Sequence, residues 1–509
     1  MSKAIVKSSF WVTLLLLVGY FVSFIKESVI ANYFGVSAEV DAYTIAIAIP
    51  VNLFGVIARS VQPIVIPIYT KLLYTEEEAT YRNYLNNLIS IVIAISIVLI
   101  VLIGVFSEPI TYIFAPGLSS STRKLVIEML WLILPTALFT VLDRIFIAVL
   151  NVHKQFVIPS ISLYFLNATL IVVIVTLHSV LGIKAACVGQ VIGSILQVLF
   201  LFIIMRKYHV FRFTFDIYDS NIRKTGKQVI PVMWSASIAE INEIVNRIVA
   251  SLLFVGAVSA IGYSSKVNTV LMLFFTSAIG TIVYPLYAES TAKKDIEQLK
   301  KRVNLTLSAY SYFLLPLMIF VLCTKKEIIE TAFARGAFDE DAVNLTQSLL
   351  GYYSIGILFL AFRDILTKVF YSLQDTITPA KNTSIGFVAN ILLSISLPFV
   401  LGVQGLAIAA SISAAFVSIR LFIQLINKHP EIELKVLVTN IKAIIIPVLI
   451  MALCIMQIRG FLSTKPFLCL ILSLTIGSLV YIVMSLLVKV PITKTMIQMV
   501  FSKNEKKNE

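Results

Sequence analysis

Charged side chains interrupt two apolar stretches of the sequence. Arg363 and Asp364 lie in LFLAFRDILTKVFYSL (358–373), and Asp143 and Arg144 lie in LFTVLDRIFIAVLNV. An ion in hydrocarbon costs about 2.5–3.5 kcal/mol on insertion scales, so such residues persist when they pair with one another or face water. We expect the two adjacent pairs to be ion pairs of a gate or of an interface between lobes. Direct substrate contact and snorkelling to the membrane surface are the alternatives.

A second set of charges lies in apolar segments that would line a cavity: Lys26, Glu27, Asp41, Arg59 and Lys266. Cations at such depths can neutralise an anionic head group, and phosphate is the obvious candidate because Lys and Arg bind it through charge and donor geometry. For Lys26, a salt bridge with a neighbouring acid is an equal alternative. Arg59 and Lys266 have no adjacent acid in the sequence, which favours a role in the cavity. We predict that these five residues bind substrate.

Acidic, amide and hydroxyl side chains form a third set of candidates: Glu240, Glu243 and Asn246, with Asn390 and Ser394 from a distant segment. They could bind a coupling ion, because oxygen ligands suit Na⁺ and a glutamate inside a membrane can take up H⁺ near neutral pH. The alternative is that the two glutamates only pair with a neighbouring arginine and satisfy helix contacts. The histidines show no metal-ligand spacing, so we expect no bound metal.

The composition indicates a membrane around these residues. Of the 509 residues, 59% are hydrophobic and 13% are charged, and the mean hydropathy is +0.94. A soluble protein of this length could not cover so much apolar side chain, so the bilayer is the plausible solvent. The sequence therefore predicts an all-α integral membrane protein. Apolar runs long enough to span a bilayer recur about fourteen times, at 10–33, 41–69, 84–107, 125–150, 156–178, 181–205, 229–255, 259–287, 303–324, 341–372, 382–400, 402–427, 437–457 and 466–488.

The connections between these runs are short and carry no catalytic motif. None is longer than about 25 residues, and the sequence contains no P-loop, G-x-S-x-G or H-E-x-x-H motif. A soluble catalytic domain would have no room in them. We therefore expect a protein that is not an enzyme and has no cofactor other than a coupling Na⁺ or H⁺.

Lys and Arg are concentrated in alternate connections. One set of connections holds about two dozen basic residues and the other about seven, within a formal net charge of +14. The positive-inside rule places the basic set, which includes both termini, in the cytoplasm. The basic stretches RKYHVFRF and KKDIEQLKKR are explained by attraction to anionic lipid, and we expect no nucleic-acid partner.

The sequence contains an internal duplication. LFTVLDRIFIAVLNV (138–152) aligns with LFLAFRDILTKVFYS (358–372) at an offset of 220, and LGIKAA aligns with LGVQGL at the same offset. Chance matches would not hold one offset across anchors spread over about 150 residues. Two copies of a six-helix unit would cross the membrane in the same direction, which is a transporter architecture. The predicted lobes are 1–227 and 228–430, and two added helices with a basic tail form 431–509.

Three stretches of the sequence contain motifs: NYFGVSAEVDAYTIAIAIP (32–50), AFARGAFDEDA followed by VFYSLQDTITPAK, and LGVQGLAIAASISA. They resemble motifs of the MurJ/MviN lipid II flippases, a family of the multidrug/oligosaccharidyl-lipid/polysaccharide exporter superfamily. The first is similar to the family's first-loop motif, the second is the more specific match, and the third continues it. The resemblance implies fourteen helices, of which two are C-terminal additions, and a V-shaped central cavity.

The resemblance also implies a function and a location. The family moves undecaprenyl-pyrophosphate-linked peptidoglycan precursor from the inner to the outer leaflet of the bacterial cytoplasmic membrane by alternating access. A cationic cavity would hold the pyrophosphate and sugar head, and a groove reaching the last two helices would shelter the lipid tail. We expect a monomer whose partners are a lipid-linked glycan and membrane lipids.

The sequence departs from the family pattern in the cavity. Where the family usually has arginines in spans 1, 2 and 8, this chain has Tyr20, Lys26, Phe54 or Gly55, and Lys266. The family's sodium-site positions fall on Asn246, Asn390 and Ser394, and two of these replace acids. The alternatives are therefore an exporter of another polyprenyl-pyrophosphate-linked oligosaccharide, a MATE-like cation-coupled drug antiporter and a membrane scaffold that transports nothing.

Overall fold

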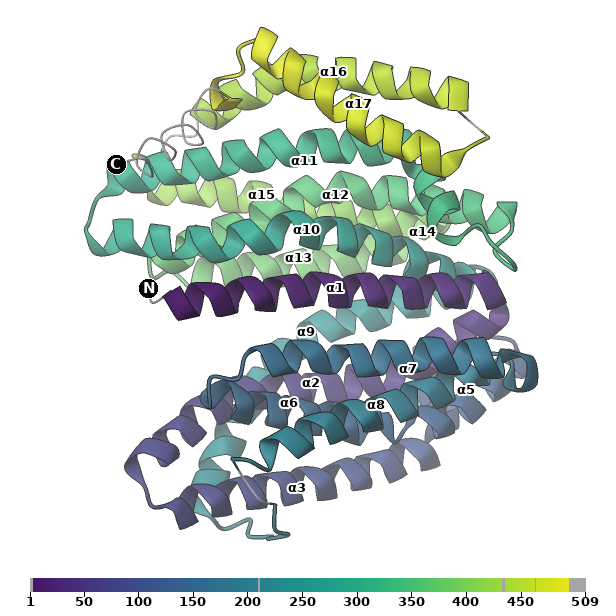
Figure 1. Ribbon diagram of the computed structural model, residues 1–509, viewed down its shortest axis with the longest axis vertical. Helices are drawn as coiled ribbons and strands as arrows, with labels where there is room; N and C mark the ends of the chain where they lie inside the picture. The colour runs from purple at the N-terminus through teal and green to yellow at the C-terminus, as the bar shows by residue number, and fades with distance from the viewer. Residues whose placement is uncertain (1–2, 209–210, 433–434, 463, 494–509) are drawn as a thin grey trace. The chain divides into compact units, whose positions relative to one another are not determined.

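A computed structural model describes residues 3–208, 211–432, 435–462 and 464–493, with side chains described except at 3–11, 13, 235, 239 and 273–282. The described residues form seventeen α-helices and no strand (Figure 1), which confirms the all-α class. The helices are α1 Lys3–Phe34, α2 Ala38–Thr75, α3 Glu78–Val105, α4 Ser107–Phe114, α5 Ser120–Ile133, α6 Thr136–Val152, α7 Val157–Leu181, α8 Lys184–Met205, α9 Ser220–Leu253, α10 Ala257–Ala292, α11 Ile296–Phe333, α12 Glu340–Ser372, α13 Ile377–Ser396, α14 Pro398–Leu401, α15 Gln404–Lys428, α16 Lys435–Leu462 and α17 Pro466–Leu487.

Most of these helices can cross a membrane. Within the described residues, eleven spans are long and apolar enough, with α13 and α14 counted as one. α5 and α6 together form a twelfth span, bent by 42°. α9 and α10 fall on the two remaining predicted spans but are not among the twelve. The integral membrane fold is therefore confirmed, and the count of fourteen stays a prediction.

Two predicted long spans are single helices. α2 has 38 residues and continues through Pro50, Pro63 and Pro67, and α12 has 33 residues. At 1.5 Å per residue, α2 is about 57 Å long, which exceeds the hydrocarbon thickness of about 30 Å. α2 is therefore longer than the hydrocarbon layer is thick.

Helix boundaries repeat at the offset found in the sequence. α5 begins at Ser120 and α12 begins at Glu340, 220 residues later. Gly182 ends α7 and Gly402 ends α14, with left-handed φ values of 57° and 60°. Glycine adopts this conformation without a steric cost, so both copies stop a helix in the same way. The duplication is thus visible in the fold as well as in the sequence.

Contacts divide the chain into two compact units. The first contains the residues up to Gly262 and the segment Gly336–Phe338, and the second contains Tyr263–Arg335 and the chain from Asp339 onward. The division falls inside α10, whereas the repeat places the lobe boundary between 227 and 228. The predicted lobes and tail (1–227, 228–430 and 431–509) therefore stay a prediction.

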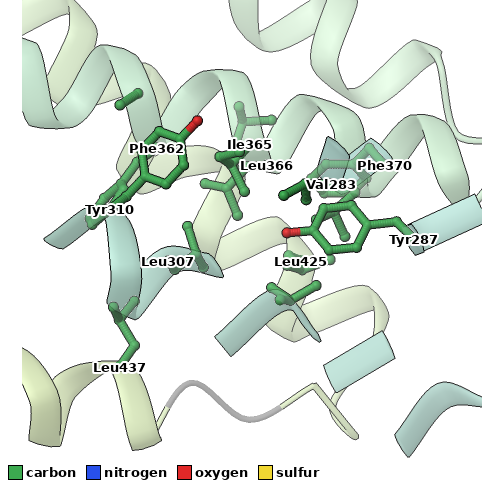
Figure 2. Close-up of a cluster of buried hydrophobic side chains, with 14 of the residues drawn as sticks. Val283, Tyr287, Leu307, Tyr310, Phe362, Ile365, Leu366, Phe370, Leu425 and Leu437 are labelled. Carbon is green, nitrogen blue, oxygen red and sulfur yellow. The ribbon is translucent and has the colours of Figure 1, made fainter. Parts of the chain in front are cut away.

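Each unit has its own packed helices. In the first unit, α2 packs on α5, α6 and α9, and α7 lies beside α8 (Figure 1). In the second unit, α12 packs on α11 and α15, and α16 lies beside α17. Figure 2 shows the core of the second unit, where Tyr287, Tyr310 and Phe362 come from α10, α11 and α12. These rings are buried, so the core fixes the neighbouring helices by contact between bulky side chains.

Apolar side chains also cover the outside of the helices. Val98 of α3, Leu453 of α16 and Leu479 of α17 are each more than half exposed. Apolar side chains exposed to this extent on long helices suit contact with lipid hydrocarbon rather than with water.

Candidate transport site

An ion network joins the middle of α2 to α9 in the first compact unit. Arg59 Nη2 forms an ion pair with Glu240 Oε1. With its amide nitrogen towards Glu240, Asn52 donates to Glu240 Oε2 over 3.1 Å, and its oxygen accepts from Arg247 Nη1 over 2.8 Å. Arg247 also lies 3.9 Å from Glu243. Five side chains from two helices thus form one connected chain whose two cations balance its two acids.

Helical spacing brings these side chains together. Asn52 and Arg59 are seven residues, or two turns, apart on one face of α2, and the three α9 residues follow the i, i+3, i+7 pattern of a single face. Gly55 lies between the two α2 residues, and a Cβ there would lie 3.2 Å from Arg59 Nη2. Its missing side chain leaves room for the guanidinium against α2.

Lys26 and Arg59 both have acidic partners. Lys26 Nζ lies 2.9 Å from Glu27 Oε1, with both side chains mostly buried, so the salt bridge considered for Lys26 is present. Arg59 has no acid beside it in the sequence and finds one in Glu240, 181 positions away. Lys266 lies on the part of α10 that belongs to the second unit, where it is half-buried. Binding of substrate by these residues stays a prediction.

Asp41 holds the start of α10. Its Oδ2 accepts a hydrogen bond of 2.6 Å from the backbone N–H of Gly256, and its Oδ1 accepts one of 2.7 Å from that of Ser259. These N–H groups belong to the first turn of a helix, where no intrahelical acceptor exists. Both oxygens of the buried Asp41 are therefore engaged in a structural contact, and its predicted contact with substrate stays a prediction.

In the first predicted gate pair, Asp143 accepts a hydrogen bond from an amide side chain. Asp143 is buried on α6, and its Oδ1 accepts a hydrogen bond of 2.8 Å from Gln197 Nε2 of α8. Its Oδ2 lies 3.7 Å from Arg144 Nε, so the predicted pair is loose. Gln197 was not expected from the sequence, because nothing local links it to Asp143.

The second predicted gate pair has a different partner. Asp364 Oδ2 lies 2.7 Å from Lys368 Nζ, one helical turn further on. Arg363 forms no ion pair with any residue that the structure describes. Lys368 and Asp364 are four residues apart and share a helix face, which suits an ion pair. The ion-pair partner of Asp364 is thus Lys368, and a gating role for Arg363 and Asp364 stays a prediction.

The predicted coupling-ion residues fall into two groups. Asn246 Nδ2 donates to Asn242 Oδ1 over 3.2 Å on α9, near the two glutamates of the arginine network. Asn390 and Ser394 belong to the second unit, where Ser394 Oγ donates to Asn390 Oδ1 over 3.3 Å. No cluster of three or more His, Cys, Asp or Glu that could hold a metal ion occurs among the described residues. Glu243 contacts the neighbouring Arg247, as in the alternative, whereas Glu240 forms its ion pair with the distant Arg59, and ion coupling stays a prediction.

Sequence reasoning also missed an ion pair in the second unit. Arg459 Nε donates to Glu327 Oε1 over 2.6 Å and so ties α16 to α11. The predicted span ended at 457, but α16 continues to Leu462, so Arg459 lies in its last turn. Longer helices than predicted brought this arginine next to a buried carboxylate.

An apolar groove lies between α11, α16 and α17 in the same unit. It has a volume of about 420 Å³ and is lined largely by apolar side chains, among them Phe320, Met451 and Ile482. The Tyr481 hydroxyl donates to the carbonyl of Tyr312 over 2.8 Å and ties α17 to α11 at this place. The groove lies where the resemblance predicts shelter for a lipid tail.

A family model described as "Lipid II flippase MurJ" matches residues 30–477. This chain belongs to the lipid II flippase MurJ family. A "Probable lipid II flippase MurJ" of Buchnera aphidicola subsp. Baizongia pistaciae is 28% identical over 385 residues, which cover 74% of this chain and 75% of the relative. The protein of the same description from Thermotoga maritima is 25% identical over 472 residues, which cover 92% of this chain and 93% of the relative.

Solved structures agree with the family. The structure titled "Lipid II flippase MurJ, inward closed conformation" has a TM-score of 0.78 and 25% identity, covering 95% of this chain and 98% of the other. A multidrug resistance MATE family transporter of the MOP superfamily has a TM-score of 0.59 at 16% identity, covering 83% of this chain and 94% of the other, and shares the fold alone. The resemblance to MurJ is thus confirmed, and the chain is a multi-pass protein of the bacterial cytoplasmic membrane in a family of transporters.

Proposed function

We propose that this protein is a lipid II flippase, which carries undecaprenyl-pyrophosphate-linked peptidoglycan precursor from the inner to the outer leaflet by alternating access. The observation that carries the proposal is the family match over residues 30–477. The intramembrane ion network of α2 and α9 supports it, because a transporter of an anionic head group needs cations at membrane depth. Ions in this place have no role in a scaffold that only spans the bilayer.

Within this function we assign the charged residues to the head group. Lys26, Arg59 and Lys266 supply cations for the pyrophosphate, and Glu27 and Asp41 keep Lys26 and the start of α10 in place. The apolar groove of α11, α16 and α17 shelters part of the lipid tail, because its lining offers hydrocarbon contacts and few polar groups. The protein works as a monomer with both termini in the cytoplasm, and Na⁺ or H⁺ drives it.

Rescue of a bacterial strain depleted of its own lipid II flippase tests this proposal. The wild-type chain restores growth, whereas Arg59→Ala and Lys266→Ala are inserted at normal levels and fail to restore it. Detergent-extracted variants keep thermal stability near that of the wild type. Loss of either variant through unfolding would show a structural role instead, and failure of the correctly inserted wild type would contradict lipid II as the cargo.

One observation favours a second cargo of the same chemical class. The family's cavity arginines are replaced here by Tyr20 and by Phe54 or Gly55, so the head-group surroundings differ from the usual ones. An exporter of another polyprenyl-pyrophosphate-linked oligosaccharide would keep the pyrophosphate cations and change the sugar contacts. Such a protein would move its own glycan lipid in vesicles and leave the depleted strain unrescued.

A further inference from the structure

The two ends of the Arg59–Glu240 ion pair differ in access. The side chain of Arg59 is 50% exposed, whereas that of Glu240 is 14% exposed. An anion can therefore reach the guanidinium from outside the network, while the carboxylate is less accessible. The guanidinium has five N–H donors in a planar fork that matches phosphate oxygens, and the ion pair with Glu240 engages Nη2.

Building on the proposed function, we propose that Glu240 is an internal counter-ion for Arg59. Glu240 occupies the guanidinium while the site is empty, and the pyrophosphate of the cargo displaces it. Asn52 and Arg247 are positioning residues that keep Glu240 in place after Arg59 has turned to the cargo. The network thus holds a cation at membrane depth without leaving it unpaired between transport cycles.

The amide of Asn52 explains how Glu240 can separate from Arg59. A carboxylate without a partner in a low-dielectric place is unstable, so an exchange needs a second donor. Asn52 is 4% exposed, and its amide nitrogen donates to Glu240 Oε2 while its oxygen accepts from Arg247 Nη1. An amide held between a carboxylate and a guanidinium is polarised by both, which strengthens both hydrogen bonds. Arg247 therefore influences Glu240 through the side chain of Asn52.

The backbone of α2 gives Arg59 freedom to move. Proline at position 63 lacks the N–H that a helix would bond to the carbonyl of Arg59, four residues earlier. Gly55 has no side chain on the preceding turn, where the guanidinium lies against α2. A small local change in α2 can therefore turn the guanidinium without breaking a complete helix or displacing a side chain at position 55.

Binding of inorganic pyrophosphate to the purified full-length protein tests the exchange by calorimetry. Glu240→Gln removes the competing charge, so we expect binding about tenfold tighter than in the wild type. Arg59→Ala loses at least about tenfold in affinity. In the double variant, Glu240→Gln gives no gain, because its effect acts through Arg59.

An exposed ion pair of the same unit supplies the matched control. Glu128→Gln breaks the contact of 2.7 Å with Lys184 and removes the same charge far along the chain. Pyrophosphate affinity should stay within about twofold of the wild type for this variant. The exchange is overturned if Glu240→Gln binds no tighter than the wild type, or if the double variant still gains affinity.

The role of Asn52 is tested by a measurement that a loss of stability alone would not change. Asn52→Leu leaves Arg59 as the remaining close partner of Glu240, so pyrophosphate binding weakens about fivefold in the wild-type background. In the Glu240→Gln background the same change has no effect on affinity. Equal weakening in both backgrounds would show that Asn52 only stabilises the fold.

Failure of the exchange and failure of the cargo assignment give different results. Should the chain not rescue the depleted strain while Glu240→Gln tightens pyrophosphate binding, the exchange stands and the cargo is another lipid-linked pyrophosphate. Should the chain rescue the strain while Glu240→Gln leaves the affinity unchanged, the exchange is wrong and the flippase function stands.

Discussion

The bent span of α5 and α6 and the continuous helix α12 occupy the same position in the two repeats. α5 begins at Ser120 and α12 begins at Glu340, but the first span bends by 42° and the second continues for 33 residues. Pro135 lies at the bend, and the matching residue of α12 is Ile355. Proline lacks the N–H that continues a helix, and the bend coincides with Pro135, whereas α2 continues through three prolines. The two repeats therefore share the position where this span begins and differ in its shape.

The acidic residues of the two spans also have different partners. Asp143 receives a hydrogen bond from Gln197 on another helix, whereas Asp364 pairs with Lys368 on its own helix. The residue that matches Gln197 in the second repeat is Val417, so the amide partner exists in one copy. Duplication has therefore preserved the helix boundaries while each copy has acquired its own partners for buried charge.

Exchanging the residues at the bend should give the largest effect. Ile355→Pro removes an N–H from the interior of α12, so we expect the free energy of unfolding to fall by about 3 kcal/mol. Pro135→Ile changes it by less than about 1 kcal/mol, because the helix is already broken there. Detergent-denaturation curves of the purified variants measure both. A tolerated Ile355→Pro would mean that α12 can bend as α5 and α6 do.

Replacing Asp143 or Asp364 should lower the free energy of unfolding by less, and the two losses should differ. Asp143→Ala leaves a buried amide without its acceptor, and we expect a loss of about 2 kcal/mol in unfolding free energy. Asp364→Ala breaks an i, i+4 pair whose acid is 43% exposed, and the loss stays below about 1 kcal/mol. The same denaturation curves test this order. Equal losses would show that burial does not separate the two pairs.

The loops that follow these two spans should differ in how their stability responds to low pH, and the difference should be small. Burial favours the neutral form of Asp375, but hydrogen bonds from Lys428 and Thr378 outweigh it and lower the pKa of Asp375 to about 2. Because its pKa is depressed in the folded state, Asp375 stabilises the fold above the unfolded value of about 4, and this contribution is lost as the pH falls towards 2. The matching residue is Gln155, which does not titrate.

Asp375→Gln gives the second loop a residue that does not titrate, like Gln155 in the first loop. We expect it to lower the free energy of unfolding by up to about 1 kcal/mol at pH 6, since solvent screens the ion pair with Lys428. The difference from the wild type shrinks between pH 4 and pH 2. Melting curves over this range test it, and a difference that persists unchanged at the acid end would exclude this carboxyl as the cause.

The fold could be predicted from the sequence because its signals are local or periodic. Apolar runs predict spans without any knowledge of contacts, and the offset of 220 predicts equivalent helix boundaries. The pair Lys368–Asp364 was also accessible from its spacing, since residues four apart share a helix face. Adjacency in the sequence drew attention to Arg363 instead, and Lys368 was left out of the candidate residues.

The connected site could not be predicted because its contacts are distant along the chain. Arg59 and Glu240 are separated by 181 positions, and each was assigned a separate role. Asn52 carries no charge, so nothing in its own sequence context marks it as a bridge. The partners of Asp41, the backbone N–H groups of Gly256 and Ser259, are more than 200 positions away along the chain. Such partners become visible only when the helices are packed.

Transport of lipid II by the purified chain in proteoliposomes tests the central claim most directly. The measured quantity is the fraction of lipid II that becomes accessible from the outside after the lipid has been supplied to the inner leaflet. The account predicts that the wild-type chain raises this fraction above that of protein-free vesicles and that Arg59→Ala leaves it at the protein-free level. A correctly inserted wild-type chain that gives no more accessible lipid II than protein-free vesicles would contradict it.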